Sequence, residues 1–236
     1  MSRLWAAAAI LLAASACSAN NNAAVTGSGS GGQRNYTVGG FDRVELAGHY
    51  DVRVTIGSAP SVRAEGDEAE LERLEVSVHN GQLRIGSKRG SWTSHGKVIV
   101  HVTAPSLQAV EVAGSGNMEV APLRAAQFRG DVAGSGNLVL QGLESDSAIF
   151  DIAGSGNVRA AGRTRAMRLD VAGSGNGELG ELQTETAEIS VAGSGGARVR
   201  ATNTAAVEIV GSGNVAVTGG ARCTVEKVGS GELSCG

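Results

Sequence analysis

The sequence predicts an all-β protein, a parallel β-helix or solenoid of about seven coils of 18–20 residues with an N-terminal β-rich cap. The first observation is a Gly-Ser-Gly core that recurs between short apolar segments in the second half of the chain. Its copies lie at 113–117, 133–137, 153–157, 172–176, 192–196, 210–214 and 228–232. The intervals between their first glycines are 20, 20, 19, 20, 18 and 18 residues, and such a period is typical of stacked coils.

The second observation is the supply of small residues. The chain of 236 residues has 36 glycines but only three Phe, two Tyr and two Trp, which suits a narrow solenoid interior better than a thick globular core. The formal net charge is -3 and no basic stripe stands out, so nucleic acid is not expected as a partner.

Residues 1–16 have the features of a signal peptide: a positive charge at Arg3, an apolar stretch too short to span a bilayer, and a small-residue cleavage site. The run before Cys17 resembles a bacterial lipobox, which would make Cys17 a lipidation site. An ordinary signal peptidase I site is the alternative. Residues 17–34, rich in Asn, Gly and Ser, then predict a flexible tether from the membrane to the domain.

Lipidation of Cys17 would also remove the odd thiol among three cysteines. The remaining pair, Cys223 and Cys235, lies on either side of the last corner, and we expect a disulfide there in an exported, oxidising compartment. Such a bridge would close the last coil and stabilise the folded state by about 3 kcal/mol in the chain-entropy model. Ser18 resembles a bacterial sorting signal for the outer membrane; a soluble periplasmic or secreted protein is the alternative.

The N-terminal region 35–105 is expected to consist of strands that open the solenoid and cover its first coil. Apolar residues alternate with polar ones over 50–56 and 98–102, as in half-buried strands. Asn80 and Gly81 supply the positive backbone angles of a tight hairpin turn between two further strands.

The repeats, residues 106–236, align into columns when their first glycines are superposed. The positions two and four before that glycine are mostly apolar and point inward, so the position between them points outward. That outward column holds Glu111, Asp131, Asp151, Asp170, Ser190, Glu208 and Glu226. We expect a solvated face that keeps the rod soluble, with Arg129 and Arg168 placed to pair locally. The functional alternative is an array that binds divalent cations or a cationic partner.

No catalytic, metal-binding or cofactor motif is recognisable in the sequence. All four histidines precede the repeats, and neither His-Glu-x-x-His nor Gly-x-Ser-x-Gly occurs. The loop 86–97 is the irregular candidate for a binding surface, because Trp92 beside Lys88 and Arg89 could stack a sugar or meet an anionic polymer. A mobile hairpin tip is the competing interpretation.

Four features together resemble a known family: the opening over 41–54, the segment 62–67, the hairpin over 80–85 and the serial Gly-Ser-Gly-Asn corners. This family is the putative auto-transporter adhesin head GIN domain, and the resemblance covers about residues 40–235. It implies a bacterial cell-envelope protein with a parallel β-helical fold, often lipid-anchored or exported. No catalytic residue carries over from it.

These observations together predict a non-enzymatic outer-membrane lipoprotein that acts in adhesion, binding or scaffolding. Its expected partners are the membrane, through the N-terminal lipid anchor, and an envelope polysaccharide or protein; no cofactor is expected. The alternative is a polysaccharide-binding or polysaccharide-cleaving β-helix that uses the aspartates of the column with neighbouring arginines, a reading that rests on fold analogy alone.

Overall fold

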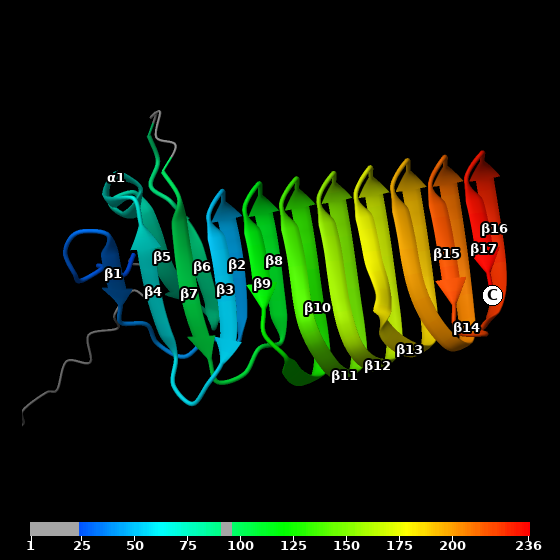
Figure 1. Ribbon diagram of the computed structural model, residues 1–236, viewed down its shortest axis with the longest axis horizontal. Helices are drawn as coiled ribbons and strands as arrows, with labels where there is room; N and C mark the ends of the chain where they lie inside the picture. The colour runs from blue at the N-terminus through cyan, green and yellow to red at the C-terminus, as the bar shows by residue number, and fades with distance from the viewer. Residues whose placement is uncertain (1–23, 91–95) are drawn as a thin grey trace, which may run out of the picture.

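The computed structural model describes residues 24–90 and 96–236, and Figure 1 shows a rod of stacked strands. Seventeen strands join in one continuous sheet that winds into a solenoid, and the described residues contain one helical turn, α1 (Glu68–Leu71). The strands are β1 (Gln33–Tyr36), β2 (Arg43–Gly48), β3 (Asp51–Ile56), β4 (Ser61–Gly66), β5 (Leu74–His79), β6 (Gln82–Ser87), β7 (Val98–Ala104), β8 (Ala109–Gly114), β9 (Asn117–Val120), β10 (Leu123–Gly134), β11 (Asn137–Gly154), β12 (Asn157–Gly173), β13 (Asn176–Gly193), β14 (Gly196–Gly211), β15 (Asn214–Thr218), β16 (Arg222–Gly229) and β17 (Glu232–Cys235). The predicted all-β solenoid is confirmed.

Each coil has an entering strand, a glycine corner, a leaving strand and a wide turn that leads into the next coil. Residues 129–134 of β10 form one entering strand, 137–140 of β11 the leaving strand after it, and 141–147 the wide turn. Equivalent segments of successive coils pair in parallel. About six turns stack in this way, close to the seven that the sequence predicts. In Figure 1 the corners lie along the upper edge and the wide turns along the lower edge.

The core is a narrow column of apolar side chains between the entering and leaving strands. Val132, Ile152 and Val171, each two residues before a corner glycine, are at most 2% exposed. Large and small residues alternate where the space demands it: a Cβ on Gly130 would lie 3.0 Å from the ring of Phe150, which fills that space. The inward columns read from the sequence therefore form the core.

The glycine corners are the tightest part of the rod. The first glycine of every repeat has a positive φ, between 118° and 140°. A Cβ on Gly154 would lie 2.5 Å from the carbonyl oxygen of Gly134, and one on Gly156 would lie 2.2 Å from that of Gly136. The Gly134 oxygen instead accepts hydrogen bonds from the backbone N–H groups of Ser155 and Gly156, at 2.9 and 3.0 Å. The corner therefore requires glycine both for its backbone angles and for the close approach of coils.

Asparagine side chains form a ladder beside the corners. The Nδ2 atoms of Asn137, Asn157 and Asn176 each donate to the Oδ1 of the asparagine one coil earlier, at 2.8, 2.9 and 3.0 Å. Asn117 begins the ladder by donating to Asp51 at 2.9 Å. Gly196 has no side chain to continue it. The ladder links the edges of successive coils through satisfied polar groups.

The order of the chain and the order of the coils differ at the N-terminal end. Strands β2 and β3 form a coil whose corner, Gly48, pairs with Gly114 of β8. After β3 the chain leaves this coil and returns as β6 and β7, which pair with β2 and β3 on one side. It then crosses to the opposite side of the same coil and continues as β8 and β9, which also pair with β2 and β3. Strands β1, β4 and β5 add to this end in antiparallel pairs and complete the predicted cap.

Part of the segment predicted as a flexible tether is packed on the cap. Residues 24–34 lie within the predicted tether 17–34, yet Ser28 and Asn35 exchange backbone hydrogen bonds of 2.8 and 2.7 Å. Strand β1 pairs with β4, and the side chain of Tyr36 at its end is 6% exposed. The prediction was wrong for these residues because it took their high glycine content as a sign of flexibility. In the structure, glycines with positive φ form the turn that precedes β1.

The C-terminal end of the rod carries the predicted disulfide between Cys223 and Cys235. In the described part of the chain, β16 pairs only with β14 and β17 only with β15, so their outer edges are uncovered. Val228 is 70% exposed there. Lys227 stands in the inward column beside Ile209, and an inward-pointing charge is one way in which a sheet edge avoids pairing with other chains.

Replacing a corner glycine tests the packing of the coils. Gly154→Ala should destabilise the protein by about 1–3 kcal/mol, because Ala must hold a positive φ and its Cβ must displace a backbone carbonyl. Urea and thermal unfolding would measure the change. Gly180→Ala is the matched control, since nothing lies within 4 Å of its Cβ position, and it should change stability by less than about 0.5 kcal/mol. Equal losses in both variants would contradict this account of the corner.

Lys227 can be tested as the residue that keeps the uncovered edge from pairing. Lys227→Val should produce dimers or larger species, because an apolar inward side chain no longer opposes stacking on this edge. Size-exclusion chromatography with light scattering would measure the mass. Lys227→Arg keeps the charge and should behave as the wild type, whereas an unchanged mass for Lys227→Val would show that something else protects the edge.

Candidate binding surfaces

The acidic column predicted from the sequence runs along the entering strands. Strand pairing places Glu111 beside Asp131, Asp131 beside Asp151, and Asp151 beside Asp170. Ser190, Glu208 and Glu226 continue the column to the last coil. The side chains of Asp131, Asp151 and Asp170 are 28%, 32% and 34% exposed. This is therefore a half-buried, flat ladder of carboxylates.

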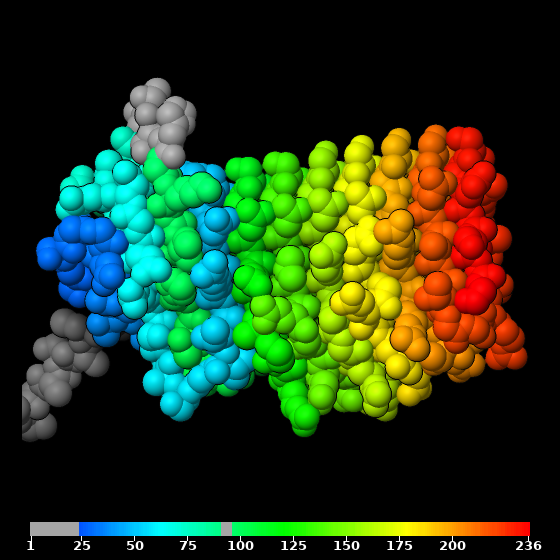
Figure 2. All heavy atoms as spheres, viewed as in Figure 1, coloured from blue at the N-terminus to red at the C-terminus, as the bar shows by residue number. Residues whose placement is uncertain are grey.

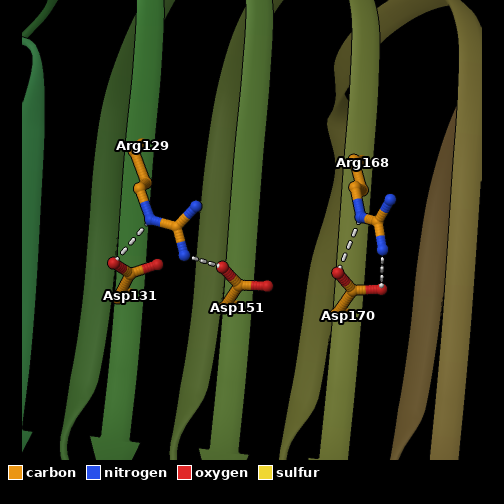
Figure 3. A network of polar contacts seen from close by, with 5 residues as sticks. All are labelled: Arg129, Asp131, Asp151, Arg168 and Asp170. Carbon is orange, nitrogen blue, oxygen red and sulfur yellow. Dashed lines mark hydrogen bonds and ion pairs between the residues drawn. The ribbon is translucent and has the colours of Figure 1, made fainter.

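Two arginines partly neutralise this column, as the sequence predicts (Figure 3). The Nε of Arg129 donates to Asp131 at 2.8 Å, and its Nη2 donates to Asp151 in the next coil. The Nε of Arg168 donates to Asp170 at 2.8 Å. Because the Arg129 guanidinium contacts Asp131 and Asp151, it links two neighbouring coils, and both arginines offset the repulsion between the carboxylates.

The titration of these groups reflects both burial and neighbouring charges. Burial raises the pKa of Asp151 above its ordinary value; Arg129 opposes this, and the carboxylates of Asp131 and Asp170 reinforce it. The hydrogen bond to Asp131 raises the pKa of Arg129, so the Arg129 guanidinium stays positively charged. An arrangement in which arginines already occupy the carboxylates favours a structural role for this column.

A groove that the sequence analysis missed follows the wide turns of five successive coils. Its volume is about 1290 Å³, and it is lined by 124–126, 144–146, 162–165, 183–185 and 202–203. Parallel pairing is interrupted along this edge, between 140 and 143, 159 and 161, 179 and 183, and 184 and 186. The entering strands keep unbroken register across the same coils. The change of the repeat interval from 20 to 19 and 18 residues is the sequence signal for this irregular edge.

The bottom of the groove is a column of hydroxyl groups held by hydrogen bonds. Thr164 and Thr184 are each 1% exposed. Ser145 Oγ donates to Thr164 Oγ1 at 3.0 Å, and Thr202 Oγ1 donates to the Thr184 carbonyl oxygen at 3.2 Å. These bonds fix the hydroxyl groups in a rigid row.

The sides of the groove carry exposed charged residues of both signs. Arg124 pairs with Glu144, and Arg165 pairs with Asp146, both at 2.9 Å. The exposed fractions of these four side chains lie between 60% and 82%. Unlike the acidic column, this surface is concave and holds its charged groups out in solvent.

Other candidate residues contribute little to a common site. His101 Nε2 lies 3.1 Å from Glu65, a hydrogen bond that lowers the pKa of Glu65, and His49 Nε2 lies 3.6 Å from Glu70. Within 24–90 and 96–236, no Ser or Cys is hydrogen-bonded to either ring, and no group of three His, Cys, Asp or Glu side chains is placed to hold a metal ion. The structure does not bring these histidines to the acidic column or to the groove.

Two predicted site residues, Cys17 and Trp92, lie outside the described residues, as does the predicted signal peptide, 1–16. In the described part of the chain, no helix has the length and apolar character needed to cross a membrane.

A family model described as "Putative auto-transporter adhesin, head GIN domain" matches residues 40–221. This range begins in the cap and includes almost the whole solenoid. No protein with a curated description matches the chain.

Several solved structures share this fold. A putative adhesin from Bacteroides fragilis superposes with a TM-score of 0.76 at 20% identity, covering 86% of this chain and 95% of its own. A putative lipid binding protein from Parabacteroides distasonis gives 0.71 at 22%, with 86% and 96% covered. A putative adhesin from Parabacteroides merdae gives 0.68 at 20%, with 86% and 94% covered. At these identities the likeness establishes the fold alone.

The acidic column leads to a prediction about pH. Burial raises the pKa of Glu111 above its ordinary value of 4.5, with Glu45 and Asp131 adding to the effect. Above that raised pKa, the folded state carries a charge that it disfavours. As the pH falls, the folded state takes up the proton before the unfolded chain, and this penalty disappears. Glu111→Gln should therefore raise the melting temperature at about pH 7 and change nothing at about pH 3, where both states are protonated.

Thermal melts of the wild type and of Glu111→Gln across this pH range would measure the difference. Glu208→Gln is the control, because Glu208 belongs to the same column but is exposed. A lower melting temperature for Glu111→Gln at neutral pH would show that the charge of Glu111 stabilises the fold.

Proposed function

This chain belongs to the putative auto-transporter adhesin head GIN domain family, and from that premise we propose that it is a non-enzymatic, adhesin-like binding protein of the bacterial cell envelope. The family match over residues 40–221 is the observation that carries the proposal. Two of the solved structures with the same fold are described as putative adhesins, which supports the same role here.

We place the membrane anchor at Cys17, as the lipidated first residue of an outer-membrane lipoprotein. Residues 17–23 separate the anchor from the first described residue, and a chain of this length reaches at most about 25 Å. Since residues 24–34 pack on the cap, a lipid on Cys17 would keep the cap end of the rod close to the membrane. The last coil, red in Figure 2, would then point away from the membrane and present the long sides of the rod to a partner.

A binding role is better supported than a cleaving role. A polysaccharide-cleaving site would need one carboxyl group free to act as an acid and another as a base or nucleophile. Asp131, Asp151 and Asp170 are instead engaged by Arg129 and Arg168 in a regular column. The partner that this reading favours is an envelope polysaccharide or protein, held without chemical change.

The anchor is tested by intact mass of the protein extracted from host membranes. The mass should correspond to a chain that begins at Cys17 and carries acyl groups, and Cys17→Ser should move the protein to the soluble fraction. Reduction should add the mass of the hydrogens that open the Cys223–Cys235 disulfide. An unacylated chain that begins at Cys17 would overturn the lipid anchor and indicate a periplasmic or secreted protein.

Adhesion is tested by comparing host cells with and without the protein. Cells that lack it should attach less to surfaces coated with envelope polysaccharide or to neighbouring cells, and the wild-type chain should restore attachment. The Cys17→Ser chain should fold but fail to restore attachment, because it is not held at the cell. Equal attachment with and without the protein would overturn the adhesin role.

A further inference from the structure

The repeat is broken along one edge of the rod, and that edge is the groove. Between the corners at Gly154 and Gly211 the number of residues in a coil changes, and each change falls in a wide turn. The strand pairing shows these changes as register shifts at 140–143, 159–161 and 179–186. Local bulges in otherwise regular sheets are over-represented at functional sites. The entering strands show no register shift, so the differences in coil length are concentrated in the wide turns that line the groove.

The shape of the groove suits an extended ligand. It crosses five coils, and with about 4.8 Å between neighbouring strands it runs for roughly 19 Å along the rod. The groove runs across strands β10 to β14, which pair with one another in parallel beneath it, so a ligand that follows the groove crosses the strands and does not extend the sheet. The groove therefore offers mainly side chains to such a ligand.

The charge of the groove excludes a preference for polyanions. Three arginines, Arg124, Arg163 and Arg165, line it together with three carboxylates, Glu144, Asp146 and Glu185, so the lining carries no net charge. A groove that selects acidic polymers or nucleic acid would show an excess of positive charge. None of the described lining residues is aromatic or a large aliphatic residue, so an apolar ligand would gain little from it.

The hydrogen-bonding groups of the groove match hydroxyl groups. Arginine side chains only donate and ionised carboxylates only accept, whereas a sugar hydroxyl does both. In the groove such donors and acceptors are the exposed arginines and carboxylates, which stand over a rigid floor where the buried Thr164 and Thr184 donate their hydroxyl protons to backbone carbonyl oxygens. We propose that the groove binds a neutral, linear polysaccharide that lies along the rod across these five coils. This inference rests on the proposed adhesin-like function and names the ligand class of its binding site.

The proposal is tested with the full chain and a panel of neutral linear glucans and mannans, an acidic polyuronate and random peptides. Titration calorimetry should show binding of at least one neutral polysaccharide. Arg163→Ala combined with Glu185→Ala leaves the lining neutral and keeps both ion pairs of the groove intact. It should weaken that binding by about tenfold or more, without a change in melting temperature.

The matched control combines Glu178→Ala with Arg198→Ala, which removes an exposed ion pair of 3.2 Å outside the groove and should leave the affinity unchanged. Wild-type affinity in the groove variant, or binding of only the polyuronate or peptides, would overturn the proposal. Absence of polysaccharide binding by a protein that still supports cell attachment would overturn the groove assignment alone. Loss of both would overturn the adhesin role as well.

Discussion

The close approach of successive glycine corners is the constraint on which the rest of the structure depends. At each Gly-Ser-Gly corner, a backbone oxygen of one coil lies 2.2–2.6 Å from the place that a Cβ of the next coil would occupy. The same oxygen accepts hydrogen bonds from the backbone N–H groups of that next coil. Coils can therefore stack at hydrogen-bonding distance only where both positions are glycine, and any side chain there would force the corner open.

This constraint sets the register of everything that leads into the corner. Because the corners cannot shift relative to one another, the entering strands are locked, and residues at equivalent positions line up in columns. Carboxylates in one such column would repel one another along the rod, and the bridging contact of Arg129 to Asp131 and Asp151 offsets that repulsion. The wide turns are free of the constraint, so changes in coil length, and the groove that accompanies them, collect there.

The two ends of the rod solve the problem of exposed strand edges differently. At the N-terminal end, antiparallel strands and residues 24–36 cover the first coils. At the C-terminal end of the described chain, the edge is left open but carries Lys227 in its inward column and the Cys223–Cys235 bridge. Covering one end and placing charge at the other are both recognised ways to keep a β-rich rod from stacking on other chains.

The sequence by itself determined the repeat: the corners, the inward and outward columns and the pairing of Arg129 with Asp131 follow from positions a fixed number of residues apart, and the cysteine count indicated the disulfide. Only the tertiary structure decided that β2 and β3 lie between strands that come later, that residues 24–34 pack on the cap, and that the wide turns form a groove. The physical reason is that a period fixes contacts between equivalent positions of neighbouring coils. Segments outside the period choose their partners by the packing and hydrogen bonding of the whole fold.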